Sequence, residues 1–352
     1  MKPWRLWSNA SSSVLVALVA ITTIAAQSAR VPSARLVQAP RLEFPARVDS
    51  SNPAVWSLVS GAHQMFVLSS WGGVPVRSIG SSLESLHNAG AVAFETHPGH
   101  GVWIEAIIPG DDDTWYAYYH HERPADLCGR NDRQLPRIGA LRSRDRGETW
   151  ADLGIVLDAP AGSEACGSQN RFVFGGVGDV TAALDPDTRD IYLYFSQYFN
   201  DAAAQGVAVA RLAWADRDDP VGKASIWNDG AWLADGAGTP LVRTRQPFHD
   251  RSPAADVFWG PSIHWNTYLE RYVMLLNRAR DDQFNNDGIY VSYSPTLGDP
   301  SQWTAPVKII DGGGWYPQVI GIEVGTGTDR FAGRRARFFL TGRSDRYIEF
   351  ER

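Results

Sequence analysis

Short apolar and aromatic runs broken by Gly, Asp, Asn and Pro make up most of the chain, and helical periodicity is scarce. The runs recur as five similar units, each of which indicates a strand, a polar turn, a second strand, another turn and a third strand. The units span residues 53–80, 102–143, 178–213, 260–294 and 316–351. The best candidate for a short helix is residues 81–88.

Five repeats of one strand order predict an all-β fold, a five-bladed β-propeller with three or four strands in each blade. The alternative folds, a β-sandwich or a jelly roll, do not predict such a recurrence. The last unit ends at the C-terminus, so we expect a strand near residues 41–44 to complete that blade and close the ring.

The N-terminus has the pattern of an export signal. Lys2 and Arg5 precede an apolar run over residues 14–26, and small residues follow it. The run is shorter than the roughly 20 residues that cross a bilayer. We therefore predict a signal peptide over residues 1–29, a single propeller domain over residues 30–352, and a secreted or periplasmic location. An uncleaved membrane anchor is the alternative.

Composition excludes two classes of protein. Charged residues make up only 20% of the chain and the net charge is −6, which argues against a disordered protein and against a basic nucleic-acid binder. The 14 tryptophans suit a large β core or a surface that stacks on sugar rings. Export would place the two cysteines, Cys128 and Cys166, in an oxidising compartment, so we expect a disulfide between them rather than two separate thiols.

Acidic residues stand at matching places in the first three units. Asp49 lies just before the first inner strand, Glu105 interrupts the apolar run of residues 102–108, and Asp179 begins the third unit. The inner strands of a propeller line its axis, so these acids are expected to meet in one funnel. A carboxyl group inside an apolar run is costly unless it is paired, protonated or facing a wet cleft.

One turn matches a known propeller motif. Residues 143–150 have the pattern S-x-D-x-G-x-T-W, which resembles the Asp-box of sialidases and other propeller proteins. Ser143 and Asp145 can bind nearby backbone N–H groups, and Trp150 can fold back as an apolar plug. We interpret this turn as structural rather than catalytic.

The order of the units and the three acids resemble the five-bladed glycoside hydrolases, namely glycoside hydrolase family 43 and the invertase and levansucrase families. The resemblance implies that Asp49 is the base or nucleophile, that Glu105 tunes a neighbouring pKa, and that Asp179 is the acid. The chain has Glu where that family has Asp in the second blade, and Asp where it has Glu in the third. Glu122 or a neighbouring histidine, His120 or His121, is the alternative acid.

Further candidates for substrate binding flank the starts of the inner strands. They are Trp103, Trp259 and Tyr316 as stacking platforms, His264 on the fourth inner strand, and Gln318 beside Tyr316. Packing between blades is the alternative role for the aromatics, and a structural role is the alternative for His264. No zinc spacing or phosphate-binding loop occurs, so no metal or cofactor is expected, apart from an axial calcium ion as an open possibility.

The sequence therefore predicts an exported, monomeric glycoside hydrolase with a carbohydrate substrate, and with neither nucleic acid nor membrane as a partner once the signal is removed. Two alternatives stay open. One is a sialidase-like exo-glycosidase, for which Arg77, Arg142 and Arg278 would have to form a triad, although the Arg-Ile-Pro signature of sialidases is absent. The other is a carbohydrate-binding propeller without catalytic activity.

Overall fold

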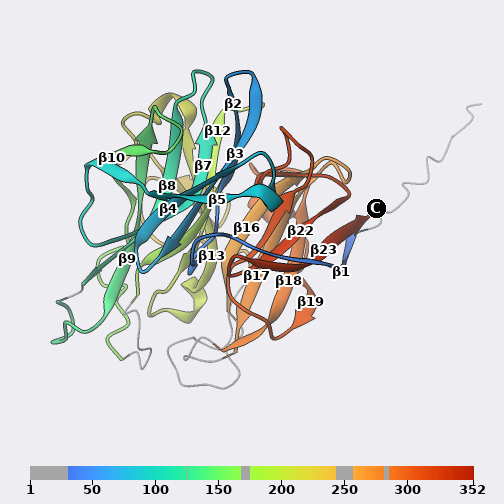
Figure 1. Ribbon diagram of the computed structural model, residues 1–352. Helices are drawn as coiled ribbons and strands as arrows, with labels where there is room; N and C mark the ends of the chain where they lie inside the picture. The colour runs from blue at the N-terminus through green and yellow to red at the C-terminus, as the bar shows by residue number, and fades with distance from the viewer. Residues whose placement is uncertain (1–30, 125, 168–174, 243–256, 281–284) are drawn as a thin grey trace, which may run out of the picture. The chain divides into compact units, whose positions relative to one another are not determined.

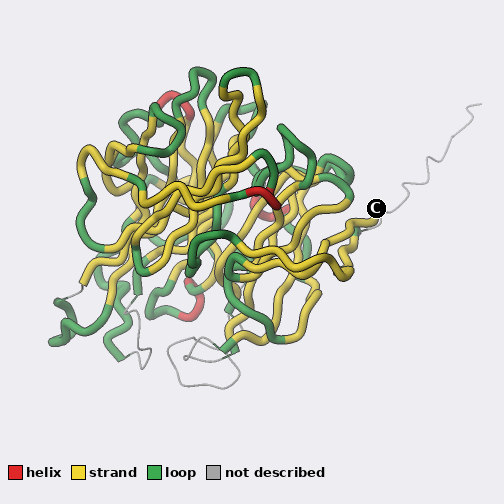
Figure 2. Tube along the Cα trace, in the orientation of Figure 1, coloured by secondary structure: helices red, strands yellow, loops and turns green. Residues whose placement is uncertain are grey.

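The computed structural model describes residues 31–124, 126–167, 175–242, 257–280 and 285–352, and the regular secondary structure of these residues is almost entirely β-strand (Figure 2). The strands form five sheets of four or five strands each, which makes a five-bladed β-propeller, as the sequence predicted. The predicted signal peptide over residues 1–29 lies outside the described residues. None of the described helices is long and apolar enough to cross a membrane.

Four blades follow the chain in order, each beginning with its inner strand (Figure 1). The first blade contains β2 (Ala54–Val59), β3 (Ala62–Trp71), β4 (Val74–Gly80) and β5 (His87–Ala91). The second contains β7 (Gly101–Pro109), β8 (Trp115–Pro124), β9 (Gln134–Ser143) and β10 (Thr149–Leu157). The third contains β11 (Val177–Leu184), β12 (Asp190–Gln197), β13 (Gly206–Ala213), β14 (Ser225–Asn228) and β15 (Ala231–Leu233). The fourth contains β16 (Phe258–Asn266), β17 (Arg271–Ala279), β18 (Asn286–Ser294) and β19 (Val307–Asp311).

The fifth blade joins the two ends of the described chain. It contains β20 (Pro317–Gly321), β22 (Arg335–Leu340), β23 (Arg343–Glu351) and, as its outer strand, β1 (Ser33–Glu43). β1 runs antiparallel to β23 from the Ser33–Glu351 pair to the Glu43–Arg343 pair, as Figure 1 shows beside the C-terminus. The predicted closing strand is therefore present, and it begins earlier than residues 41–44.

Two short strands belong to a blade other than the one their chain position suggests. β6 (Ala93–Thr96) pairs parallel with β10 at the edge of the second blade, and β21 (Phe331–Ala332) pairs parallel with the end of β16. The helix expected over residues 81–88 is only a 3-10 turn, followed by β5. The described helices are such turns, at Leu83–Ser85, Ala202–Ala204, Trp214–Asp216 and Pro300–Gln302.

The core lies between neighbouring blades, because each sheet faces one blade on each side. Ile138 and Tyr118 of the second blade pack with Val180, Leu193 and Phe195 of the third, and all five side chains are almost fully buried. Because both faces of each sheet are buried against a neighbouring blade, successive side chains on a strand are apolar on both sides. The strands are therefore nearly continuous apolar runs.

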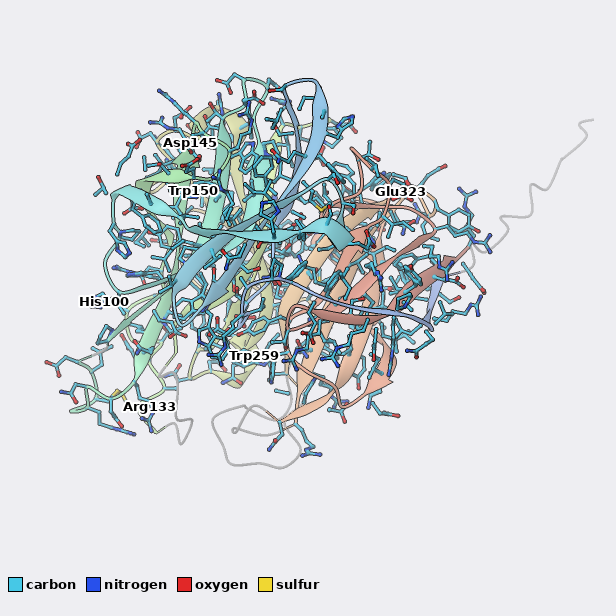
Figure 3. All side chains as sticks on the ribbon, viewed as in Figure 1. His100, Arg133, Asp145, Trp150, Trp259 and Glu323 are labelled. Carbon is cyan, nitrogen blue, oxygen red and sulfur yellow. A yellow bond between two sulfur atoms is a disulfide. The ribbon has the colours of Figure 1, made fainter. Side chains whose placement is uncertain are left out.

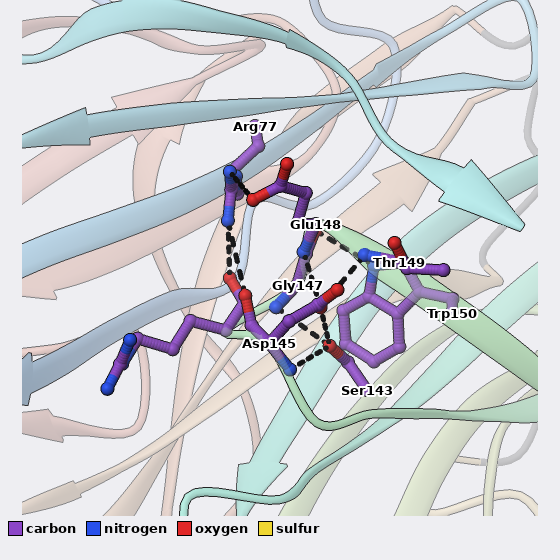
Figure 4. A network of polar contacts seen from close by, with 8 residues as sticks. Arg77, Ser143, Asp145, Gly147, Glu148, Thr149 and Trp150 are labelled. Atoms are coloured by element: carbon purple, nitrogen blue, oxygen red, sulfur yellow. Dashed lines mark hydrogen bonds and ion pairs between the residues drawn. The ribbon is translucent and has the colours of Figure 1, made fainter.

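The turn at residues 143–150 has the local geometry expected from its sequence (Figure 4). Asp145 Oδ1 accepts hydrogen bonds from the backbone N–H groups of Glu148 (3.1 Å) and Thr149 (2.9 Å), and from the Ser143 hydroxyl (2.7 Å). The Trp150 indole donates to the Gly147 carbonyl at 3.1 Å, and its side chain is fully buried. The turn joins β9 to β10 on the outer side of the second blade, away from the inner strand β7.

We expect Asp145→Ala to lower the free energy of unfolding by about 1–3 kcal/mol, because three donors lose their acceptor. Urea unfolding would measure the change. Asp111→Ala, in an exposed loop, is the control and should change stability little. A loss of activity without a loss of stability would contradict the structural role.

Candidate active site

The starts of the inner strands meet at one end of the propeller axis and bring together the acids that the sequence singled out. Asp49 precedes β2, Glu105 lies on β7, and Asp179 is the third residue of β11. Glu122, near the end of β8, and His120, two residues before it, join them. We call these four carboxyl groups with His120 the acid cluster.

β-Bulges aim two of these acids at the axis. The pairing of β7 with β8 shifts between Ile104 and Ala106, which leaves Glu105 as the extra residue. The pairing of β11 with β12 shifts between Gly178 and Thr181, and Asp179 there has a positive φ of 45°. Bulges redirect a side chain at the cost of a ladder bond, and a non-glycine residue at positive φ is strained. Both irregularities fall on acids of the cluster.

Glu105 is the most enclosed of the four acids. Its side chain is 3% exposed, and its Oε2 accepts a hydrogen bond from the Val180 N–H at 2.7 Å. Burial, and then the negative charge of Asp179, raise the pKa of Glu105 to about 8. One oxygen of Glu105 and one of Asp179 lie within 4.8 Å of each other. Glu105 therefore keeps its proton at neutral pH beside a second, more accessible carboxyl group.

His120 bridges the acids of the second and third blades. Its Nδ1 accepts the backbone N–H of Asp179 at 3.1 Å and lies 3.7 Å from Asp179 Oδ1, while its Nε2 lies 3.6 Å from Glu122 Oε1. Burial opposes the charged form of His120, but Asp179, Glu122 and Glu105 outweigh it and raise its pKa. A Cβ on Gly178 would come within 2.5 Å of the imidazole ring, so only glycine leaves room for His120 there.

Asp49 faces the cluster from the first blade. Its Oδ1 accepts the Trp103 indole N–H at 2.6 Å, and its Oδ2 accepts the Gly72 N–H at 2.9 Å. Burial raises the pKa of Asp49, although these two donors act in the opposite direction. The Trp103 ring also lies edge-on to His120, with 5.7 Å between ring centroids. Trp103 thus links Asp49 to His120.

Two tyrosines border the cluster. Tyr198, which follows β12, donates its hydroxyl to Asp179 Oδ2 at 2.6 Å and stacks on Trp259 with ring centroids 4.1 Å apart. Burial and then the charge of Asp179 raise the pKa of Tyr198, so the hydroxyl keeps its proton. Tyr316 precedes β20; burial and the charges of all four acids raise its pKa, which places it beside the whole cluster. The sequence offered no signal for Tyr198.

Three other predicted residues lie apart from the acid cluster. His121 points away from His120, as alternation along a strand requires, and its ring contacts the Gly99 carbonyl (2.7 Å) and Arg137. Gln318 uses both ends of its amide on the backbone of Asn52, so it joins the first and fifth blades. His264 is enclosed near Phe350, and burial lowers its pKa to about 3.

Glu105, His120 and Asp179 resemble a set of metal ligands in residue type and spacing. Their hydrogen bonds do not fit that role. Nδ1 of His120 accepts the Asp179 backbone N–H at 3.1 Å, and Oε2 of Glu105 accepts the Val180 N–H at 2.7 Å, so both atoms already have a hydrogen-bond partner. We assign no metal to these residues.

The sialidase alternative requires three arginines around one carboxylate, and the candidate arginines do not meet. Arg77 binds the outer turn of the second blade through Glu148, Arg142 pairs with Asp218 at 2.8 Å, and Arg278 lies 3.7 Å from Asp287 in the fourth blade. They therefore form no carboxylate-binding triad.

A disulfide lies at the same end of the propeller. Cys128, in the loop after β8, is bonded to Cys166, in the segment before β11, which is the pairing that the sequence predicts. Since β8 carries His120 and Glu122, and β11 carries Asp179, the disulfide ties together the two blades that supply most of the acid cluster.

Tyr198→Phe should lower kcat about tenfold with little change in KM, because the hydroxyl only orients Asp179. The matched control is Tyr293→Phe, whose buried hydroxyl has no hydrogen-bond partner among the described residues. Equal effects of the two variants would contradict a positioning role.

Comparison with known proteins agrees on the fold. No protein-family model and no curated protein matches the sequence. Among solved structures, the endo-arabinase of Bacteroides thetaiotaomicron VPI-5482 aligns with a TM-score of 0.53 and 10% identity over 88% of this chain and 96% of that chain. An exo-1,5-alpha-L-arabinanase from a bovine ruminal metagenomic library aligns with a TM-score of 0.49 and 14% identity over 86% of this chain and 94% of that chain. An inulosucrase of Halalkalicoccus jeotgali aligns with a TM-score of 0.49 and 14% identity over 86% of this chain and 75% of that chain. At these identities the likeness shows the fold, and this chain has the propeller fold of the endo-arabinase.

Proposed function

We propose that the protein is a glycoside hydrolase that cleaves glycosidic bonds of an oligo- or polysaccharide at the acid cluster. The observation that carries the proposal is a carboxyl group held protonated at neutral pH, Glu105, against a second carboxyl group, Asp179, with Asp49 facing both. Glycosidic cleavage needs one acid to protonate the leaving oxygen and one carboxylate to act at the anomeric carbon.

The exposure of the acids suggests their roles. Glu105 is too enclosed to touch a sugar, so it stores the proton, and Asp179, which is partly exposed, delivers it to the leaving oxygen. Asp49 is also partly exposed and is held by two N–H donors, which suits a base or nucleophile. Glu122 lies on the other side of His120 and is the alternative acid.

Activity on a panel of substrates tests the proposal. Structures of similar fold include enzymes named for arabinan, xylan and galactan, so these polymers and the matching aryl glycosides form the panel. We expect turnover of at least one substrate by the wild type, and loss of that turnover in both Glu105→Gln and Asp179→Asn. Carbohydrate binding that survives both substitutions, without turnover by the wild type, would instead identify a binding propeller.

We also propose that the chain is exported and acts as a monomer, with the turn at residues 143–150 as an Asp-box. The Cys128–Cys166 disulfide supports export, since disulfides persist in oxidising compartments. The hydrogen bonds of Ser143, Asp145 and Trp150 support the Asp-box assignment. Mass spectrometry of the secreted protein, with and without reductant, would test the location and the disulfide together.

A further inference from the structure

Two neighbouring cavities lie at the end of the axis opposite the acid cluster, where the inner strands finish. The first, of about 430 Å³, is lined by β2, by the end of β7 and by the loop between β20 and β22. The second, of about 530 Å³, lies against the β11–β12 and β16–β17 hairpins. Arg330 and Phe331 line both cavities. Figure 3 shows Glu323, from the first cavity, and Trp259, beside the acid cluster, on opposite sides of the propeller.

Arg330 brings to this end a positive charge that forms no ion pair with the described residues, although the buried Asp329 carboxyl group acts on it electrostatically. No carboxylate among the described residues lies within ion-pair distance of its guanidinium, and its Nε is enclosed with no hydrogen-bond partner. The neighbouring Asp329 uses Oδ1 to accept the Ala54 N–H at 2.8 Å instead. Burial lowers the pKa of Arg330, and the negative charge of Asp329 acts in the opposite direction. Because enclosed charges are normally paired, this guanidinium is ready for an anion from outside.

Aromatic side chains surround the guanidinium. Phe331 is 43% exposed, and its ring centroid lies 5.5 Å from the guanidinium carbon of Arg330. Trp265 and Tyr272 line the second cavity on the other side of Phe331. The backbone holds this arrangement in place, since the Trp265 N–H donates to the Arg330 carbonyl at 2.8 Å and Phe331 pairs with Trp265 in β21.

The other charged groups of the walls are engaged elsewhere or lie at the edge. Asp185 accepts the N–H groups of Asp187 and Thr188 and so closes its own turn. Arg189 lies 3.6 Å from Asp111. Glu323 and Asp187 are exposed and can accept hydrogen bonds from hydroxyl groups. Arg330 is the one cation of these walls without an ion pair in the part of the chain that the structure describes.

We propose that this end of the propeller is a second binding site, for a sugar ring that carries a carboxylate, that is, a uronic acid. The planar guanidinium of Arg330 holds the carboxylate through paired hydrogen bonds, and Phe331 packs against the apolar face of the ring. The anion chemistry is independent of the proposed hydrolase activity, and only the choice of a sugar as its carrier rests on that activity.

Titrations with small probes test this site in the full-length protein. Glucuronate, glucose and acetate are titrated separately into the wild type and followed by saturation-transfer NMR. We expect glucuronate to bind at least tenfold more tightly than either glucose or acetate. Arg330→Gln should weaken glucuronate binding at least tenfold, whereas Arg189→Gln, a matched arginine of the same walls, should change it less than twofold. Phe331→Ala keeps the charge and should weaken glucuronate binding several-fold without affecting acetate.

The outcomes separate this site from the proposed hydrolase. Unchanged glucuronate binding in both Arg330→Gln and Phe331→Ala would overturn the proposal, as would equal binding of glucose. If acetate binds as tightly as glucuronate, the uronic acid is not the ligand and the site binds a simple anion. If Arg330→Gln fails to fold, Arg330→Lys and Phe331→Ala decide in the same way. Hydrolysis of an aryl glycoside should be unchanged in Phe331→Ala, and a wild type that binds glucuronate but hydrolyses nothing refutes only the hydrolase.

Discussion

Asp179→Asn is expected to lower kcat on an aryl glycoside with a poor leaving group by about 10³-fold or more, within the range that general acid catalysis supplies. Glu105 and Asp179 share a proton, and Asp179 is the more accessible of the two. An amide in place of Asp179 cannot deliver that proton. The fold should survive, since Asn retains an oxygen that accepts the Tyr198 hydroxyl.

Leaving groups separate this role from a merely structural one. A dinitrophenyl glycoside needs little protonation to depart, so Asp179→Asn should lose far less activity on it than on a simple alkyl or phenyl glycoside. Asp49→Asn should lose activity on both, because the base or nucleophile acts on every substrate. Asp187→Asn, at the far end of the same blade, serves as the control. An equal loss on both substrates would contradict Asp179 as the acid.

The strands and the acids of this propeller were readable from the sequence because both follow from local patterns. The unit at residues 53–80 was expected to hold three strands and contains β2, β3 and β4, and the strand that closes the ring followed from a blade left one strand short. Glu105 stood out because a carboxyl group breaks an apolar run, which burial makes costly. Each of these patterns can be recognised within a short stretch of sequence.

Features that depend on distant partners could not be predicted. The adjacent histidines His120 and His121 look alike in sequence, and only the facing blade decides that His120 reaches the acids. Gln318 resembles a binding residue until the Asn52 backbone, more than 260 positions away, takes both ends of its amide. Tyr198 carries no local signal, because its role comes from Asp179 across the bulge of β11.

The two short strands that pair with another blade also could not be predicted from the sequence. β6 and β21 are too short to be recognised by alternation, and each pairs in parallel with a strand of another part of the chain. The helix expected over residues 81–88 fails for a related reason. The pairing of β5 with β4 takes His87 and Asn88 into the sheet, so only one 3-10 turn remains. Tertiary pairing overrides local preference at these sites.

Glu105→Gln should gain stability relative to the wild type, by an amount that grows as the pH rises. The pKa of Glu105 is about 8 in the folded protein and about 4.5 in the unfolded chain. Below pH 4.5 both states hold the proton, and the group has no pH effect. Between these values the folded protein binds more protons than the unfolded chain. The free energy of unfolding of the wild type therefore falls as pH rises, by about 1.4 kcal/mol per pH unit at most from this group.

Glutamine cannot ionise, and its oxygen can still accept the Val180 N–H, so the variant should escape this loss. Relative to the wild type, Glu105→Gln should gain stability by several kcal/mol between pH 5 and pH 8, as measured by urea unfolding at each pH. Activity should move the other way and fall about 100-fold, because the pair no longer stores a proton for Asp179. A stability difference that is the same at pH 5 and pH 8 would show that Glu105 is ionised in the folded protein. That result would refute the proposal that Glu105 stores a proton for Asp179.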